Sequence, residues 1–255
     1  AVSFRTPGVS WNEADGSYQV LLDSLETGEQ FQTLYPGFTP GEDITVSLQA
    51  VRGELLPAVA EDRDNSLFER RGGNAVSVAN RRHLQNLCTG FSNVEETVTR
   101  AVQSMEIQWE SGRWFRPIEN KDLTDFDGGG QVIAGLRIQG TESSYELGLF
   151  GSFLGSAAAP KTIRNVRLRD PRVENNVTRG TCGTLAGRLS DAAVENCQAY
   201  ASGSDADSFL TAAGNAGGLV GYAVNCDFSA CSAALPSLAV ISGNAGGLVG
   251  VMEGG

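Results

Sequence analysis

The sequence predicts an all-β protein whose main part is a parallel β-helix, a solenoid of stacked turns. The first of three observations is an internal repeat: the stretch 214–221, Gly-Asn-Ala-Gly-Gly-Leu-Val-Gly, returns unchanged at 243–250. The second is its period, because Leu185, in a looser copy, is followed by Leu219 and Leu248 at intervals of roughly 30 residues, a size that indicates stacked units. The third is the 32 glycines, which lack the regular spacing of collagen and separate short apolar stretches.

Composition limits the class of protein. With 255 residues, 41% of them apolar, the chain is long enough for one long domain or two ordinary ones. The formal net charge of −11 repels nucleic acid and anionic bilayers, so nucleic acid is not an expected partner. No apolar run approaches the roughly 18 residues of a spanning helix, and we expect no membrane insertion in this segment. Five cysteines are an odd number, so at least one thiol is free unless it pairs between chains.

Residues 1–72 are expected to form a small β module of open role, followed by a linker. The stretches 18–22 and 44–48 have the apolar content of short strands, and two Pro-Gly pairs, at 36–37 and 40–41, supply turns. The charged and glycine-containing residues from 61 to 73 have the composition of a linker. We therefore expect a boundary near residue 72 and a second domain at 73–255.

A short helix is expected at the start of the second domain, where it would cap the open end of the sheets. Asn80 is a suitable N-cap, and Leu84 and Leu87 share one face of a helix over 81–88. His83 lies on the same helix and is expected at the surface. As the only histidine, it excludes the zinc-protease motif with two histidines on one helix.

Short strands with inward apolar residues are expected after the helix, and each later repeat holds two elements. One is the Gly-Leu strand, and the other ends in a cysteine: Cys197 and Cys231 are separated by the same interval as Leu185 and Leu219. Stacking at about 4.8 Å per turn predicts two ladders of equivalent residues. The first contains Leu149, Leu185, Leu219 and Leu248, and the second contains Val166, Cys197 and Cys231. In the second ladder, Cys197 and Cys231 could be buried thiols or could form a disulfide. Val166 is an apolar residue at the same position of an earlier turn, which favours buried thiols.

Three Gly-Leu-x-Gly cores, at 148–151, 218–221 and 247–250, resemble the GLUG-motif repeats of bacterial cell-surface proteins, while the copy at 184–187 has Thr184 in place of the first glycine. The segment ahead of them is also similar, with Glu-Ile at 106–107, Phe-Arg-Pro-Ile at 115–118 and Asp-Gly-Gly-Gly at 127–130. The resemblance covers about residues 76–255. It implies a right-handed parallel β-helix in a secreted or wall-attached adhesin-like protein, with no catalytic motif of its own. Since the chain stops in mid-repeat, we expect a monomeric piece of a longer protein, truncated at its C-terminus.

The acidic run 122–128 is a candidate calcium site, because hard cations take several oxygen ligands. Asp122, Asp125 and Asp127 would supply them. The EF-hand pattern fails, since Leu123 would be its first residue and Ala134 its twelfth. A solvated turn is the favoured alternative, so no cofactor is expected.

Three aromatic residues, Trp109, Trp114 and Tyr145, are candidate ligand contacts, because flat apolar rings stack on sugars. Packing under a loop is the alternative. An enzyme of the polysaccharide lyase or glycosidase class would instead need convergent charged groups, for which the candidates are Glu106, Glu110, Asp125, Asp127 and Arg137.

The expected function is non-enzymatic. We predict a fragment of an extracellular bacterial protein, secreted or at the cell surface, that acts as an adhesin or stalk. Its partner would be a host or bacterial surface glycan or protein. The alternatives are a carbohydrate-active β-helix enzyme and an accessory module of a larger surface protease, because the GLUG repeat also precedes the catalytic part of surface metalloproteases that cleave immunoglobulin A.

Overall fold

The computed structural model describes residues 9–12, 17–20, 69–70, 74–88, 98–109, 114–140, 146–175, 180–203 and 208–254, with side chains from residue 74 onward except that of Arg82. The chain divides into two units, Ala1–Leu67 and Phe68–Gly255. In the first unit, strands β1 (Val9–Asn12) and β2 (Ser17–Val20) pair antiparallel. The expected strand at 44–48 and most of the expected linker lie outside the described residues, and the boundary near residue 72 stays a prediction.

The described part of the second unit consists of β-strands and one short helix, and its strands form four sheets in which only β3 and β4 pair antiparallel. The long sheet has the order β24-β20-β16-β12-β7-β5-β4-β3, with β11 also paired to β16. Its strands are β3 (Glu69–Arg70), β4 (Ala75–Val78), β5 (Arg100–Gln103), β7 (Asp125–Asp127), β11 (Phe150–Leu154), β12 (Lys161–Arg164), β16 (Ala186–Glu195), β20 (Val220–Ser229) and β24 (Val249–Glu253).

The other three sheets are named here by their first strands. The β6 sheet contains β6 (Ile107–Gln108), β8 (Val132–Ala134), β13 (Arg167–Arg169), β17 (Gln198–Tyr200) and β21 (Ser232–Ala234). The β9 sheet contains β9 (Arg137–Gln139), β14 (Arg172–Asn175), β18 (Phe209–Ala212) and β22 (Leu238–Val240). The β10 sheet contains β10 (Glu146–Leu147), β15 (Thr181–Cys182), β19 (Ala216–Gly217) and β23 (Ala245–Gly246).

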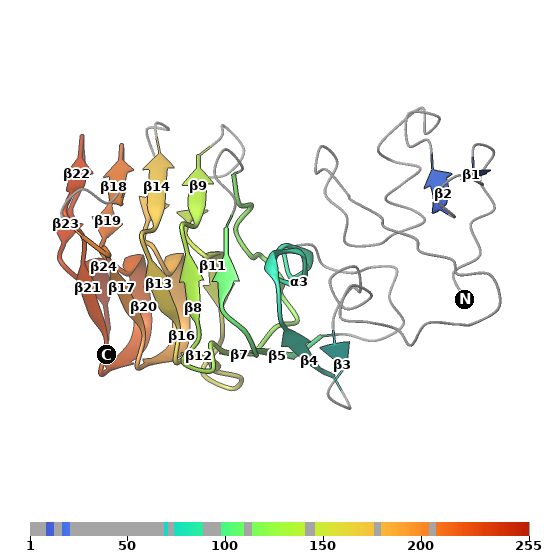
Figure 1. Ribbon diagram of the computed structural model, residues 1–255. Coiled ribbons are helices and arrows are strands. Elements are labelled where there is room, and N and C mark those ends of the chain that lie inside the picture. Colours follow the sequence, from blue (N-terminus) through green and yellow to red (C-terminus); the bar gives the residue numbers. More distant parts are fainter. Residues whose placement is uncertain are drawn as a thin grey trace. The chain divides into compact units, whose positions relative to one another are not determined.

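The chain passes through the four sheets in a repeated order. From β7 onward it visits the long sheet, the β6 sheet, the β9 sheet and the β10 sheet, and then returns to the long sheet. Strands of successive turns therefore lie side by side, as β9, β14, β18 and β22 do in Figure 1. The prediction of an all-β protein with parallel strands is confirmed, and this path is compatible with a parallel β-helix.

The corner between the long sheet and the β6 sheet repeats the same backbone conformation. Asn165, Asn196 and Ala230 occupy it in successive turns with φ of 55°, 51° and 52°. Asparagine adopts this left-handed conformation more readily than most residues. The side chains also connect the turns, because the amide nitrogen of Asn196 donates to the side-chain oxygen of Asn165 at 2.9 Å. Stacked corners hold the strands on both sides in register.

Strands β16 and β20 are longer than the sequence suggested. Each runs for ten residues and joins the Gly-Leu element to the element before the cysteine, which we expected to be separate. Asp191 and Asn225 lie inside these strands with φ of 45° and 49°. One left-handed residue bends a strand as a bulge does without ending its pairing, so the two elements merge.

The last two full turns differ in length at one corner. Strands β17 and β18 are separated by residues 201–208, whereas β21 and β22 in the next turn are separated by residues 235–237. This difference explains why Leu248 follows Leu219 at a shorter interval than Leu219 follows Leu185. The register of the strands is the same in both turns.

Helix α3 (Arg81–Asn86) follows β4, and the prediction of a short helix capped by Asn80 is confirmed, since the Asn80 side chain accepts from the His83 backbone N–H at 2.9 Å. Leu84 and Leu87 are fully buried. His83 is also fully buried, so its expected place at the surface was wrong. It precedes Leu87 by four residues and therefore shares its face. No helix in the described ranges is long and apolar enough to span a membrane.

Candidate binding surface on the long sheet

The Gly-Leu-x-Gly cores lie where the β10 sheet meets the long sheet, and their glycines allow the backbones of neighbouring turns to touch. A Cβ added to Gly148 would lie 2.6 Å from the Cα of Ala186, and one added to Gly221 would lie 2.5 Å from the backbone nitrogen of Cys182. Thr184, which replaces the first glycine in one copy, is fully buried and donates its hydroxyl hydrogen to the carbonyl oxygen of Gly218 at 2.6 Å. The motif therefore has a packing role.

The leucines of these cores form one buried column. Phe150, Ala186, Val220 and Val249 pair in register, which places the preceding residues Leu149, Leu185, Leu219 and Leu248 at one position of successive turns. The first three are fully buried, and Leu248 packs partly buried against the same core.

Three residues after each leucine, the side chains point outward and form a second column on the long sheet. Ser152, Arg188, Tyr222 and Val251 pair in register there. The Arg188 guanidinium lies 5.4 Å from the centre of the Tyr222 ring, a cation–π contact. Two carboxylates flank the column: Glu146, whose Oε1 is 3.8 Å from Nη1 of Arg188, and Glu253. A hydrogen bond to Glu253 raises the pKa of the Tyr222 hydroxyl. We call Glu146, Ser152, Arg188, Tyr222 and Glu253 the Arg–Tyr column.

Sequence reasoning missed the Arg–Tyr column, although the repeat contained the signal for it. Arg188 and Tyr222 follow Leu185 and Leu219 by the same three residues. Within β16 and β20 the side chains alternate, so Arg188 and Tyr222 point outward beside the buried Leu189 and Ala223. The repeat therefore aligned its outward residues as well as its leucines.

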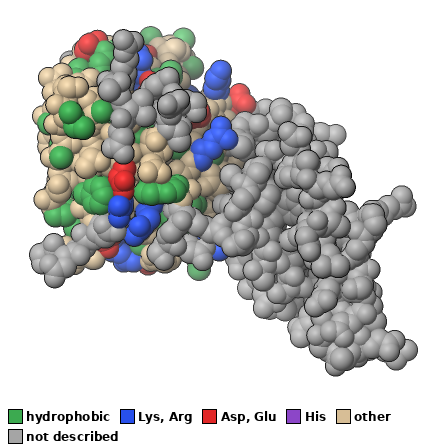
Figure 2. Space-filling view, turned by 90° about the horizontal axis from the view of Figure 1, so that it is seen from above, with side chains coloured by type: hydrophobic (Ala, Val, Ile, Leu, Met, Phe, Trp, Pro, Cys, Tyr) green, Lys and Arg blue, Asp and Glu red, His purple; other side chains and the backbone are tan. Residues whose placement is uncertain are grey.

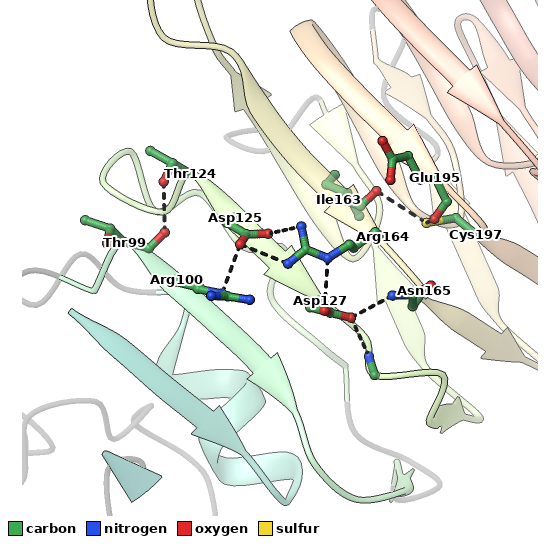
Figure 3. A network of polar contacts seen from close by, with 11 residues as sticks. Thr99, Arg100, Thr124, Asp125, Asp127, Ile163, Arg164, Asn165, Glu195 and Cys197 are labelled. Carbon is green, nitrogen blue, oxygen red and sulfur yellow. Dashed lines mark hydrogen bonds and ion pairs between the residues drawn. The ribbon is translucent and has the colours of Figure 1, made fainter. Parts of the chain in front are cut away.

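The acidic residues proposed for calcium belong to an ion-pair network between turns (Figure 3). Arg164 on β12 reaches between the two carboxylates of β7: its Nη1 is 3.1 Å from Oδ1 of Asp125, and its Nε is 2.9 Å from Oδ2 of Asp127. Arg100 on β5 approaches Asp125 from the other side, with Nε 3.0 Å from Oδ2. Asn165 donates to Asp127 at 3.0 Å.

This network pairs both carboxylates with arginine side chains, while the buried Oδ1 of Asp125 has the ion pair with Arg164 but no hydrogen bond. Burial alone would raise the pKa of Asp127, but hydrogen bonds from the Asn165 side chain, the Gly129 backbone and Arg164 outweigh it and lower that pKa. Asp122 is not part of the network, and its backbone N–H donates to Asn120. In the described part of the chain, no three His, Cys, Asp or Glu side chains are placed to hold a metal. The structure thus brings Asp125 and Asp127 together around Arg164 and leaves Asp122 apart from them.

The three aromatic candidates have different environments. Trp109 is only 4% exposed and packs edge-on against Phe115, with ring centres 5.1 Å apart, so it offers no face to a sugar. Trp114 is 43% exposed and remains available for contact. Tyr145 lies outside the described residues. Packing, the alternative considered for these residues, holds for Trp109.

The charged residues considered for an enzyme lie on different sheets. Asp125 and Asp127 are on the long sheet, Glu106 precedes β6 and its Oε1 is 2.7 Å from Nη2 of Arg169, and Arg137 begins β9. Glu110 lies outside the described residues. Figure 2 shows acidic and basic side chains interspersed with uncharged ones on the face turned to the viewer.

All five cysteines are described, and all are free thiols. The backbone N–H of Gln198 donates to the carbonyl oxygen of Val166, and that of Ser232 donates to the carbonyl oxygen of Cys197, which aligns Val166, Cys197 and Cys231. Val166 and Cys197 are fully buried, whereas Cys231 is partly exposed. Cys182 pairs with Ala216 in the buried core, and burial raises its pKa to about 12.

Neither family models, nor curated proteins, nor solved structures match this chain. The interpretation of its surface therefore depends on the geometry described above.

Proposed function

We propose that the chain is a non-enzymatic part of an extracellular bacterial protein, secreted or at the cell surface, and that its second unit is a right-handed parallel β-helix acting as an adhesin or stalk. The observation that carries the proposal is the alignment of equivalent residues through successive turns in all four sheets. Such a stack is stiff, extends by repetition and exposes a continuous side face, which suits projection and adhesion.

The resemblance of the Gly-Leu-x-Gly cores to GLUG-motif repeats supports the extracellular setting. In this chain all four copies lie at the same corner, including the copy that begins with Thr184. The shared motif thus corresponds to one packing arrangement, the close contact of two backbones. The outward residues three positions after each leucine are not part of this contact and differ between the turns.

The Arg–Tyr column is the surface we propose for ligand contact, with a surface glycan as the partner. Tyr222 is partly exposed, and Arg188 lies over one face of its ring, so the pair presents an aromatic edge beside a guanidinium, with Glu146 and Glu253 as acceptors for sugar hydroxyls. Trp114 is a second exposed aromatic contact.

The acidic residues considered for an enzyme lie on different sheets, which supports a binding protein over a glycosidase. A glycosidase needs two carboxyl groups on either side of one bond. Asp125 and Asp127, the nearest pair in sequence, are instead bridged by Arg164.

The test is a glycan and matrix-protein array probed with the 255-residue protein. We expect specific binding that is reduced at least about tenfold in Tyr222→Ala, since a stacking aromatic contact contributes about one to two orders of magnitude in affinity. Tyr200→Ala is the matched control, because Tyr200 is a partly exposed tyrosine on the β6 sheet.

Three results would contradict the proposal. A shortened glycan product would show an enzyme. Equal loss of binding in both tyrosine variants would show that the Arg–Tyr column is not the contact surface. Absence of binding to any glycan or matrix protein would leave only the stalk part of the proposal.

A further inference from the structure

Two cysteines of neighbouring turns face each other at the corner between the long sheet and the β6 sheet. Cys197 precedes β17 and Cys231 precedes β21, and the pairing of Gln198 with Ser232 places them side by side. Residues paired across neighbouring parallel strands are about 4.8 Å apart. Disulfides need Cα atoms about 4.4 to 6.8 Å apart, so this spacing is within range.

The two thiols are also in contact. The Cys197 thiol forms a hydrogen bond with the sulfur of Cys231, and this bond lowers the pKa of Cys231 while it raises that of Cys197. Each sulfur also lies near backbone carbonyl groups: the sulfur of Cys197 is 3.3 Å from the carbonyl oxygen of Glu195 and 3.7 Å from that of Ile163 (Figure 3). Cys231 contacts the carbonyl oxygens of Ser229 and Val194 at 3.3 and 3.4 Å.

The members of the pair differ in access. In the 255-residue chain Cys231 lies in the last turn, next to the terminal strand β21, and is partly exposed, whereas Cys88, Cys182, Cys197 and Cys226 are buried. Burial also raises the pKa of Cys182 and Cys226, which makes these thiols poor nucleophiles. A small disulfide in solution therefore meets one reactive thiol, and a single second thiol lies beside it.

We propose that Cys197 and Cys231 are a redox pair that closes reversibly into a disulfide between two turns. The oxidant is a low-molecular-weight disulfide, R–S–S–R. The Cys231 thiolate attacks one of its sulfurs, which breaks the S–S bond and releases one RS⁻ that takes up the proton lost by Cys231. Cys197 then loses its proton and attacks the Cys231 sulfur, releasing the second RSH. In total, two protein thiols are oxidised and one R–S–S–R is reduced to two RSH.

This inference is independent of the proposed binding function. It concerns the stability of the stack, because the bond would link two successive turns and enclose the chain of one whole repeat. A cross-link restricts the unfolded chain, and for a loop of roughly 35 residues we expect the melting temperature to rise by about 5 to 10 °C.

The experiment treats the folded 255-residue protein with oxidised glutathione and follows free thiols, intact mass and the peptide map. We expect loss of two thiols, a peptide that joins Cys197 to Cys231, no retained glutathione, and reversal by dithiothreitol. In Cys197→Ala the attacking thiol remains without its partner, so one glutathione should stay bound at Cys231. In Cys231→Ala no thiol should react, and Cys226→Ala, the matched control, should behave as the wild type.

Several outcomes would overturn the proposal. One is retention of all five thiols after oxidation of the folded wild-type protein. Another is a stable glutathione adduct on wild-type Cys231, which would show that Cys197 cannot reach it. A third is a cross-linked peptide that contains Cys88, Cys182 or Cys226. Intact mass and the peptide map of the wild-type protein distinguish these outcomes even if a variant fails to fold.

Discussion

Replacement of Leu219 by alanine should strongly destabilise the second unit. Leu219 is fully buried in the middle of the leucine column, between Leu185 of the preceding turn and Leu248 of the following one. The backbones on either side are fixed by hydrogen bonds, with Leu185 N to Leu219 O and Leu219 N to Leu248 O both at 2.9 Å. The turns therefore cannot move together to fill the space. Burial and cavity contributions together cost about 2 to 5 kcal/mol for such a change.

The melting temperature measures this effect directly. At about 2 to 4 °C per kcal/mol for a domain of this size, Leu219→Ala should lower it by about 4 to 20 °C. Leu154→Ala is the matched control, because Leu154 is 46% exposed on β11, and it should change the melting temperature by less than about 2 °C. Leu248→Ala should lie between the two, since Leu248 is only partly buried. Equal melting temperatures for Leu219→Ala and Leu154→Ala would refute the reasoning.

The remaining predictions concern the glycines and the acidic network. Gly221→Ala should lower the melting temperature by at least several degrees, because its Cβ would lie 2.5 Å from a backbone nitrogen of the preceding turn, whereas Gly203→Ala, with nothing within 4 Å, should not; equal shifts would contradict this. Since the folded pKa of Asp127 lies below its ordinary value of 3.8, its stabilisation is present above that pH and is lost as the pH falls through the folded pKa. In thermal melts between about pH 5 and 2, Asp127→Asn should therefore show a shallower acid loss than the wild type; parallel curves would count against the network. Calcium should leave the wild-type melting temperature unchanged, because Arg164 already occupies the carboxylates of Asp125 and Asp127, and a rise would restore the calcium site.

The sequence repeat predicted which residues lie at equivalent positions of neighbouring turns. The spacing of Leu185, Leu219 and Leu248 in the sequence is sufficient to align them, and the register of β16, β20 and β24 has the same alignment. Local signals were also sufficient for α3, whose N-cap and apolar face lie within a few residues of each other.

Contacts between unlike residues of different turns could not be predicted. Arg164 lies one turn beyond Asp127 in the chain, and nothing in the acidic run itself indicates that a guanidinium will come to lie between its carboxylates. The missing information for Arg164 was a long-range contact with no repeated signature. The burial of His83 differs, because its position four residues before the buried Leu87 is a local signal that was available in the sequence.

The corner between β17 and β18 has a consequence for how such a chain can diversify. It is longer than the corresponding corner between β21 and β22, yet the strands on both sides keep their pairing. Extra residues there lengthen the connection between two strands, and the strands on both sides keep their register with the next turn. A foreign peptide inserted between Gly203 and Ser208 should therefore leave the pairing of β17 with β21 and of β18 with β22 unchanged.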